Sequence, residues 1–395
     1  MSQLPIVYLK PGKEQSLKRF HPWVFSGAIK NVKGNLEEGD LVAVHDANDN
    51  FLAIGHYQIG SIAIRIVSFE RETIDDDFWR KKIAVAWMLR TTLGLSQSQQ
   101  TNAFRLIHGE GDGLPGLIVD IYDSTAVMQM HTVAMYRLRE TLLKALKDVM
   151  GDRLSAVYEK SEGTLPFKSG VEAENGYLFG QAKSHLALEN GLSFKVDWEK
   201  GQKTGFFVDQ RDNRALLEKY SSGRTVLNTF CYTGGFSCYA MRGGAKLVHS
   251  VDSSERAIML TNENVELNFP DDKRHEAFAS DTYKFMEKTA NNYDLIVLDP
   301  PAFAKHLNVV KNALQGYKRI NAKAIEMIAP GGILFTFSCS QVVSREAFRT
   351  MLFSAAARSG RNVRILHQLN QPADHPVSIF HPEGEYLKGF VLCVE

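Results

Sequence analysis

The sequence predicts an α/β protein in which a Rossmann-like domain occupies the C-terminal half and follows a small β-barrel and a small α+β domain. From about residue 225 onward, short apolar runs alternate with segments of helical period. Repeated strand–helix units of this kind require parallel strands joined by helical crossovers. Before residue 70, by contrast, short apolar runs are separated by turns alone, which is typical of a small barrel or sandwich.

The chain has 395 residues, more than one typical hydrophobic core accommodates, so two or three domains are expected. The hydrophobic pattern changes from strand-like to helical near Asp75, and it changes again near Leu186. We therefore predict domains at residues 1–72, 73–185 and 186–395.

The composition excludes several classes of protein. Lys and Arg number 46 against 45 Asp and Glu, so the chain is not a generally basic protein that coats nucleic acid. No apolar run approaches the roughly 18 residues that span a bilayer, and the N-terminus lacks the layout of a secretory signal. We expect a cytoplasmic protein that does not enter a membrane. The four cysteines form neither a CxxC pair nor a zinc-like cluster, so no metal site is expected.

The first domain is predicted to contain five short strands, broken by turns such as Pro11-Gly12. The expected strands span residues 6–10, 23–29, 40–46, 51–58 and 62–69. Between Lys10 and Lys33 the chain carries six basic residues and one acidic residue. This run indicates either a binding patch or an ordinary solvated surface.

The middle domain is predicted to mix both kinds of element. A helix is expected at 75–93 and another at about 134–149, and strands at 104–110, 116–123, 125–131 and 154–160. The segment GEGDGLPG at 109–116 concentrates glycine and proline, as a tight connection between strands requires.

The last domain begins with a predicted hairpin at 186–198 and continues as strand–helix units. Its expected strands cover 225–230, 246–252, 275–280, 294–301, 331–340, 362–369 and 387–395. The final two follow each other without a helix, so one strand of the sheet runs antiparallel. Seven strands with the last one reversed resemble the layout of class I S-adenosylmethionine (AdoMet) methyltransferases.

Residues at the ends of these strands indicate a nucleotide site, because ligands of open α/β sheets bind at the carboxyl ends of the strands. The glycines after Thr233 let the backbone approach a ligand, and Asp252 can accept the ribose hydroxyls of AdoMet or NAD. A helix N-cap is the alternative role for Asp252 and Asp281. The predicted cofactor-binding residues are Asn228, Phe230, Tyr232, Thr233, Gly234, Asp252, Ser253, Asp281, Asp299 and Gln210.

The DPP turn at Asp299-Pro300-Pro301 favours AdoMet over NAD, because dehydrogenases do not usually carry this turn or end on a reversed strand pair. Two prolines fix the backbone and remove two N–H groups beside the carboxylate. Such a rigid turn is suited to hold a planar base against a methyl donor.

Cys339 is the candidate nucleophile. Carbon 5 of a pyrimidine becomes reactive only after a thiolate adds to C6, which is covalent catalysis. Cys339 lies in TFSCS, at the end of the strand after DPP, and is therefore expected beside that turn. A buried structural cysteine is the alternative. We predict Cys339 and Asp299 as catalytic residues, with Asp299 contacting N3 or the exocyclic amine of cytosine.

Six motifs resemble one family over nearly the whole chain: GQKTGFFVDQR, NTFCYTGGFS, DPPAFAK, TFSCS, ADHPV and EYLKGF. They are similar to those of bacterial 23S ribosomal RNA cytosine-C5 methyltransferases of the RlmI type. The resemblance implies a PUA domain, a small central domain and a methyltransferase domain. It also implies AdoMet as cofactor, 23S rRNA as partner and 5-methylcytidine as product. Separately from the resemblance, we count a homodimer among the candidate assemblies.

The PUA-like interpretation gives the basic N-terminal run an RNA-binding role. We assign RNA contacts to Lys10, Lys13, Lys18, Arg19, Pro300, Pro301 and Lys305. Trp23 and Phe25 could stack on a base, but their alternation is also that of core strand residues.

Three questions stay open at this stage. The base that removes the C5 proton could be His375, Lys305 or an ordered water. The DPP turn also resembles the NPPY turn of amino-methylating enzymes, which leaves N-methylation of a purine as a second hypothesis. A third is a non-catalytic RNA-binding assembly factor that keeps AdoMet as a structural ligand.

Overall fold

The computed structural model describes residues 4–166, 170–289, 292–304 and 306–395, which form two compact units. The first unit comprises Met1–His185, Val196–Phe206 and Ala373–Gly384. The second comprises Leu186–Lys195, Phe207–Pro372 and Glu385–Glu395. The predicted division into three domains, at 1–72, 73–185 and 186–395, concerns segments that fold independently, and it stays a prediction.

The N-terminal part of the first unit is a six-stranded sheet with the order β2-β6-β5-β4-β1-β3, antiparallel except between β1 and β4. Its strands are β1 (Ile6–Leu9), β2 (Trp23–Phe25), β3 (Ile29–Lys33), β4 (Leu41–His45), β5 (Phe51–Tyr57) and β6 (Ile62–Ser68), and its helix is α1 (Gln15–Lys18). We predicted five strands here. The structure has a sixth because a 3₁₀ turn at Ser26–Ala28 ends β2 and a separate strand, β3, follows it.

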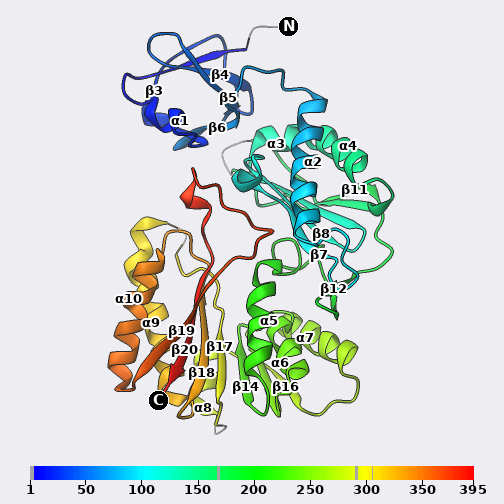
Figure 1. The fold of residues 1–395 in the computed structure, drawn as a ribbon, viewed down its shortest axis with the longest axis vertical. Coiled ribbons are helices and arrows are strands. Elements are labelled where there is room, and N and C mark those ends of the chain that lie inside the picture. Colours follow the sequence, from blue (N-terminus) through cyan, green and yellow to red (C-terminus); the bar gives the residue numbers. More distant parts are fainter. Residues whose placement is uncertain (1–3, 167–169, 290–291, 305) are drawn as a thin grey trace. The chain divides into compact units, whose positions relative to one another are not determined.

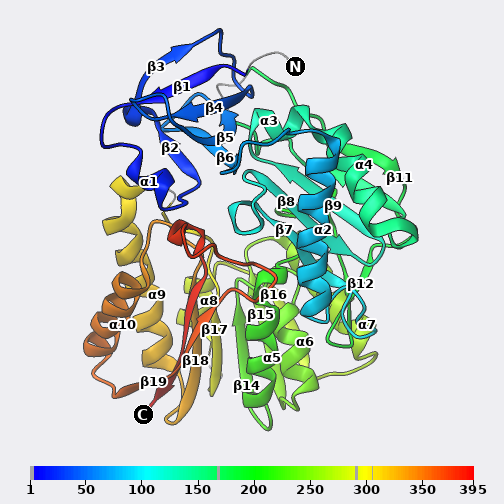
Figure 2. The same ribbon diagram turned by 45° about the horizontal axis from the view of Figure 1, so that its top comes forward.

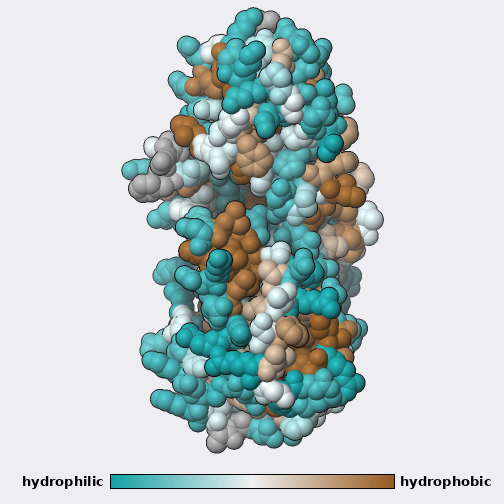
Figure 3. Space-filling view, turned by 90° about the vertical axis from the view of Figure 1, so that its left-hand side faces the viewer, coloured by the Kyte–Doolittle hydropathy of each residue, from teal (hydrophilic) through white to brown (hydrophobic). Residues whose placement is uncertain are grey.

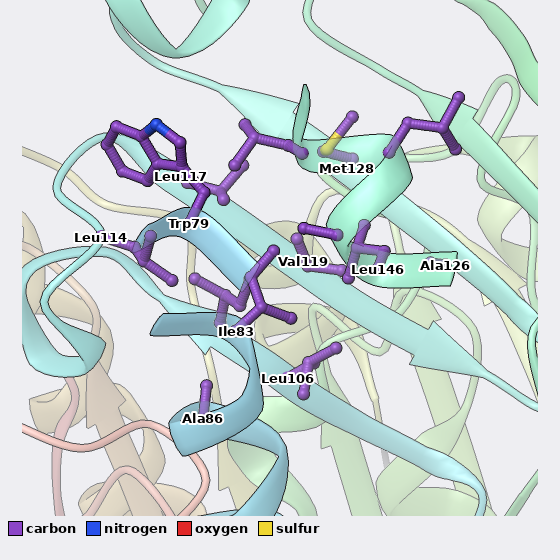
Figure 4. Packing of buried hydrophobic residues seen from close by; sticks show 14 of the residues in the cluster. Trp79, Ile83, Ala86, Leu106, Leu114, Leu117, Val119, Ala126, Met128 and Leu146 are labelled. Carbon is purple, nitrogen blue, oxygen red and sulfur yellow. The ribbon is translucent and has the colours of Figure 1, made fainter. Parts of the chain in front are cut away.

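The rest of the first unit is built on a five-stranded sheet with the order β11-β10-β9-β8-β7. Its elements are α2 (Asp76–Thr92), β7 (Ala103–His108), β8 (Leu117–Tyr122), β9 (Thr125–Met130), α3 (Val133–Arg137), α4 (Arg139–Met150), β10 (Ala156–Glu159) and β11 (Gly176–Gly180). Helices α2 and α4 lie against this sheet (Figure 2) and share one apolar core with it. In that core Trp79 and Ile83 of α2 pack against Leu117 and Val119 of β8 (Figure 4).

The second unit contains a seven-stranded sheet with the order β16-β15-β14-β17-β18-β20-β19. Its strands are β14 (Thr225–Thr229), β15 (Leu247–Asp252), β16 (His275–Ala279), β17 (Leu295–Leu298), β18 (Gly332–Ser338), β19 (Val363–Asn370) and β20 (Lys388–Val394). The first five pair in parallel, and β20 pairs antiparallel with both β18 and β19. The predicted reversal at the end of the sheet is therefore confirmed.

Six helices cover the two faces of this sheet. They are α5 (Arg211–Tyr220), α6 (Gly235–Arg242), α7 (Glu255–Asn268), α8 (Thr282–Lys288), α9 (Val310–Met327) and α10 (Arg345–Ser359). Figure 1 shows α5, α6 and α7 on one side of the strands and α9 and α10 on the other. Each parallel connection contains a helix, as parallel pairing requires.

The second unit also contains a hairpin, β12 (Leu186–Glu189) and β13 (Leu192–Lys195), which we predicted at 186–198. A buried ion pair connects it to α5: the guanidinium of Arg214 donates to both carboxylate oxygens of Glu189, at 2.8 and 2.7 Å. Arg214 also donates to the carbonyl of Phe207 (3.0 Å), and Tyr239 donates to Glu189 (3.0 Å). Every charged group of this cluster is therefore hydrogen-bonded, which buried charges require.

No helix among the described residues is long and apolar enough to cross a membrane. Figure 3 shows one face of the molecule, where hydrophobic residues form separate patches within a mostly hydrophilic surface.

We predict that Arg214→Met lowers the free energy of unfolding by about 3–5 kcal/mol, because it leaves the carboxylate of Glu189 buried without its counter-charge. Urea denaturation measures this change. Lys195→Met is the matched control: its exposed ion pair with Glu263 contributes at most about 1 kcal/mol. Equal losses in the two variants would contradict the role of the buried pair.

Candidate active site

The candidate site lies at the carboxyl ends of the parallel strands of the second unit. β15, β14, β17 and β18 are neighbours in the sheet, so the residues that follow them meet at one edge. Asp252 ends β15, Phe230 follows β14, Asp299 follows β17 and Cys339 follows β18. The topology thus brings together the strand ends that the sequence singled out.

The loop between β14 and α6 has an unusual backbone. Phe230 and Tyr232 have φ of 53° and 47°, and Gly234 has φ of 78°. For residues with a side chain this region is disfavoured, so neighbouring groups must hold the loop. Thr261 of α7 does so by donating its hydroxyl to the carbonyl of Tyr232 at 2.8 Å, and Asn264 donates to that of Thr233 at 2.9 Å.

Asp252 organises this loop through its carboxylate. One oxygen accepts the N–H of Tyr232 at 3.1 Å, and the other accepts the N–H of Ser254 at 2.9 Å. The N-cap of α7 is Ser254, whose hydroxyl accepts the N–H of Ala257, so Asp252 is not the helix cap. The carboxylate is partly exposed and oriented by backbone donors, which leaves lone pairs for a ligand.

Other predicted cofactor residues differ in accessibility. Asn228 and Thr233 are buried, and the side-chain amide of Asn228 donates to Ser237 at 2.9 Å. Ser253 and Asp281 are exposed. Asp281 caps α8, because its carboxylate accepts the N–H of Lys284 at 2.9 Å. The side chains of Asp252, Ser253 and Asp281 are therefore more accessible than those of Asn228 and Thr233.

Asp299, the first residue of the DPP turn, accepts a hydrogen bond from the 3₁₀ turn that precedes α5. The side-chain amide of Gln210, in the 3₁₀ turn Val208–Gln210, donates to the carboxylate of Asp299 at 3.0 Å. Gln210 is buried, and its own oxygen accepts from Asn213 at 2.6 Å. Pro300 is buried whereas Pro301 is exposed. The sequence thus named both Gln210 and Asp299, but not their contact.

Cys339 is partly exposed and lies against the DPP turn, with its Sγ 4.0 Å from the carbonyl oxygen of Pro300. Its two neighbours have a different environment: the hydroxyls of Ser338 and Ser340 lie 3.1 and 3.2 Å from the buried hydroxyl of Tyr317 in α9. Ser340 also accepts the N–H of Ala304 at 3.3 Å. A hydrogen bond therefore links the end of β18 to the segment that follows β17.

The remaining cysteines have structural environments. Burial raises the pKa of Cys231 to about 12 and that of Cys238 to about 12. Such thiols stay protonated at neutral pH and are poor nucleophiles. Cys393 is partly buried within β20. The chain therefore offers Cys339 as the cysteine at the strand-end edge that is both accessible and next to the DPP turn.

Sequence reasoning missed two residues beside Cys339: Tyr317 and Lys388. Lys388 is buried at the start of β20 and donates to the carbonyls of Ser340 and Val343 at 2.7 and 2.6 Å. A lysine that opens an otherwise apolar strand, KGFVLCV, was the available signal. Nothing comparable distinguished Tyr317 within its amphipathic helix.

The predicted RNA-binding residues fall into two groups. Lys10, Lys13, Lys18 and Arg19 belong to the first unit, where all four are exposed. Pro300 and Pro301 belong to the second unit, and Lys305 lies outside the described residues.

His375, one of the candidate bases for removal of the C5 proton, belongs to the first unit and is buried. The centre of its ring lies 5.0 Å from that of His108.

No group of acidic, histidine and cysteine side chains able to hold a metal ion is found in the described part of the chain.

Two family models match the sequence. One, described as S-adenosylmethionine-dependent methyltransferase, matches residues 105–382, and one described as PUA-like domain matches residues 7–69.

Relatives and solved structures agree with these matches. A protein from Alteromonas mediterranea named Ribosomal RNA large subunit methyltransferase I is 40% identical over 394 residues, which cover 98% of each chain. A protein of the same name from Pseudoalteromonas translucida is 39% identical over 395 residues, covering 98% of this chain and 99% of the relative. A crystal structure of a protein described as a methyltransferase complexed with SAH is 25% identical, with a TM-score of 0.86 over 100% of both chains.

We predict that Gly234→Ala destabilises the second unit by about 2–4 kcal/mol. The positive φ of Gly234 disfavours any side chain, and an added Cβ would lie 2.8 Å from Cγ2 of Thr261, which supports the loop. Gly223→Ala is the control, because Gly223 has φ of +70° but no atom within 4 Å of the added Cβ. Its cost should stay near 1–2 kcal/mol. Equal unfolding free energies for both variants would show that the contact with Thr261 does not matter.

Proposed function

Because the chain belongs to the family of S-adenosylmethionine-dependent methyltransferases that includes the proteins named Ribosomal RNA large subunit methyltransferase I, we propose that it methylates C5 of a cytosine in 23S rRNA. The observation that carries the choice of carbon 5 is the accessible Cys339 against the DPP turn. An enzyme that methylates an amino nitrogen needs no such thiol, because that nitrogen attacks the methyl donor itself.

The strand-end residues fit the family's cofactor. S-Adenosylmethionine, when bound, supplies a methyl group carried on a positively charged sulfur. Asp252, oriented by two backbone N–H groups, would accept hydrogen bonds from the ribose hydroxyls, and exposed Asp281 would accept one from the adenine amine. The loop around Phe230, Tyr232 and Gly234 would contribute its backbone groups to the contact with the cofactor.

The proposed reaction begins with attack of the Cys339 thiolate on C6 of cytosine. The S–C6 bond forms while the C5–C6 double bond opens, and its electrons form the bond from C5 to the methyl group as the bond between that group and the cofactor's sulfur breaks. A base, for which His375, Lys305 and an ordered water are the candidates, then takes the C5 proton. The electrons of the C5–H bond restore the C5–C6 double bond, the S–C6 bond breaks and the thiolate is released. Asp299 would contact N3 or the exocyclic amine and stabilise the charge that develops there. The Gln210 amide keeps the carboxylate of Asp299 oriented for this contact.

Binding of RNA is proposed to use the PUA-like region and the DPP side of the site. Lys10, Lys13, Lys18 and Arg19 are exposed, as contacts with phosphates require. Trp23 is better explained structurally, because its indole N–H donates to Glu110 at 2.8 Å. In the second unit, exposed Pro301 is accessible to a target base.

A homodimer, allowed by the sequence, stays a prediction that analytical ultracentrifugation would test.

We predict that Cys339→Ala lowers methylation of 23S rRNA by more than about a thousandfold but leaves the affinity for S-adenosylmethionine within about twofold. Nucleoside mass spectrometry of RNA from cells that lack the gene, methylated in vitro, measures the product. Cys393→Ala is the matched control and should keep full activity. Retained activity in Cys339→Ala would overturn the nucleophile, and a methyl group on an adenine or guanine amine would overturn cytosine C5.

Asp252→Ala should raise the dissociation constant for S-adenosylmethionine by about 10- to 100-fold, because charged hydrogen bonds contribute about 1.5–3 kcal/mol and the loop loses its anchor. Isothermal titration calorimetry measures the constant. Glu263→Ala, which removes a partly exposed carboxylate from α7, is the control and should bind normally. An unchanged constant in Asp252→Ala would exclude this role.

A further inference from the structure

Lys388 is a buried lysine beside the strand end that carries Cys339. As the first residue of β20, it pairs in antiparallel register with Ser338, the last residue of β18. Its side chain is 3% exposed. Its ammonium donates to the carbonyls of Ser340 (2.7 Å) and Val343 (2.6 Å), which lie in the loop directly after Cys339. The lysine thus bonds to both ends of the segment 340–343.

The surroundings of Lys388 do not neutralise its charge. No carboxylate in the described part of the chain forms an ion pair with it; Glu385 pairs instead with Arg345 of α10 at 2.8 Å. Burying an ammonium without a counter-charge is costly, and burial lowers the pKa of Lys388 to about 8. A leucine or methionine would fill this position without that cost, so the charge itself requires an explanation.

Among the residues that the structure describes, three ionisable groups act electrostatically on Lys388. They are Cys339 at the end of β18, Arg345 on α10 and Glu385 before β20. A negative charge on Cys339 raises the pKa of Lys388. Tyr317 of α9, whose hydroxyl lies 3.1 Å from that of Ser338, the cross-strand partner of Lys388, contributes a neutral hydroxyl, and burial raises its pKa. Since Glu385 and Arg345 offset each other, a thiolate at Cys339 is the anion that Lys388 can stabilise.

We propose that Lys388 is a positioning residue for Cys339, which fixes the loop after the cysteine with two hydrogen bonds and stabilises its thiolate with a buried positive charge. The proposal rests on the proposed function, in which that thiolate attacks C6. Lys388 transfers no proton in this role. The same positive charge that stabilises the thiolate before the attack also favours its departure when the S–C6 bond breaks.

The reactivity of Cys339 toward iodoacetamide tests this directly, without RNA or methyl transfer. Alkylation requires the thiolate, which displaces iodide as the S–C bond forms. Its rate at the Cys339 peptide is measured by mass spectrometry against pH in wild type, Lys388→Met, Lys388→Gln and the control Lys219→Met, an exposed lysine of α5. We expect the pH midpoint to rise by about one unit in both Lys388 variants, giving about tenfold slower alkylation near pH 7. Lys219→Met should match wild type.

The pH profile of methylation separates a charge effect from a structural one. In the Lys388 variants kcat should fall most at low pH and recover as the pH rises, because more thiolate then forms, while KM for RNA changes little. A purely structural defect would lower the rate by one factor at all pH values. Lys388→Gln keeps an N–H donor for one carbonyl and serves as the reference if Lys388→Met fails to bind S-adenosylmethionine.

The two proposals fail in distinguishable ways. An unshifted alkylation midpoint in both Lys388 variants, with methylation abolished in Cys339→Ala, would overturn the role of Lys388 and leave the proposed function intact. Methylation that persists in Cys339→Ala would overturn the proposed function, whatever the alkylation midpoint shows.

Discussion

The candidate site depends on one constraint: parallel strands connected by helical crossovers all end at the same edge of the sheet. β15, β14, β17 and β18 are neighbours in the sheet. The residues at their carboxyl ends therefore lie at one edge although they are distant in sequence: Asp252, the loop after Thr229, Asp299 and Cys339. Hydrogen bonds then set the details at that edge. Asp252 holds the loop after β14, and Gln210 holds Asp299. The sheet supplies proximity and these polar contacts supply orientation.

The end of β18 shows how the Cys339 thiol is kept accessible. Successive side chains of an extended segment point to opposite sides. Ser338 and Ser340 both lie within hydrogen-bond distance of the hydroxyl of Tyr317, whereas Cys339 between them lies against the carbonyl of Pro300. The buried hydroxyls are therefore satisfied inside the fold, as buried polar groups must be. The Cys339 thiol therefore lies at the DPP turn. Lys388 donates a hydrogen bond to the loop that follows Cys339.

Patterns that repeat along the chain were predictable, and pairings between distant segments were not. The strand–helix alternation predicted the order of elements and the reversed β20, and residue type at strand ends predicted Asp252, Asp299 and Cys339 as neighbours. The separate strand β3 was missed because a short 3₁₀ turn has no strong sequence signal. The contacts of Gln210 and Lys388 depend on register and on how loops close, which single-residue patterns do not encode.

The central claim is that Cys339 bonds covalently to C6 of a cytosine. RNA in which the target cytosine is replaced by 5-fluorocytosine tests it most directly. Release of the enzyme requires a proton to leave C5, and fluorine at that position cannot leave as a cation, so the covalent adduct is trapped. We expect a denaturation-resistant protein–RNA complex that requires S-adenosylmethionine and is attached at the Cys339 peptide. A complex of equal yield with Cys339→Ala, or attachment at another residue, would contradict it.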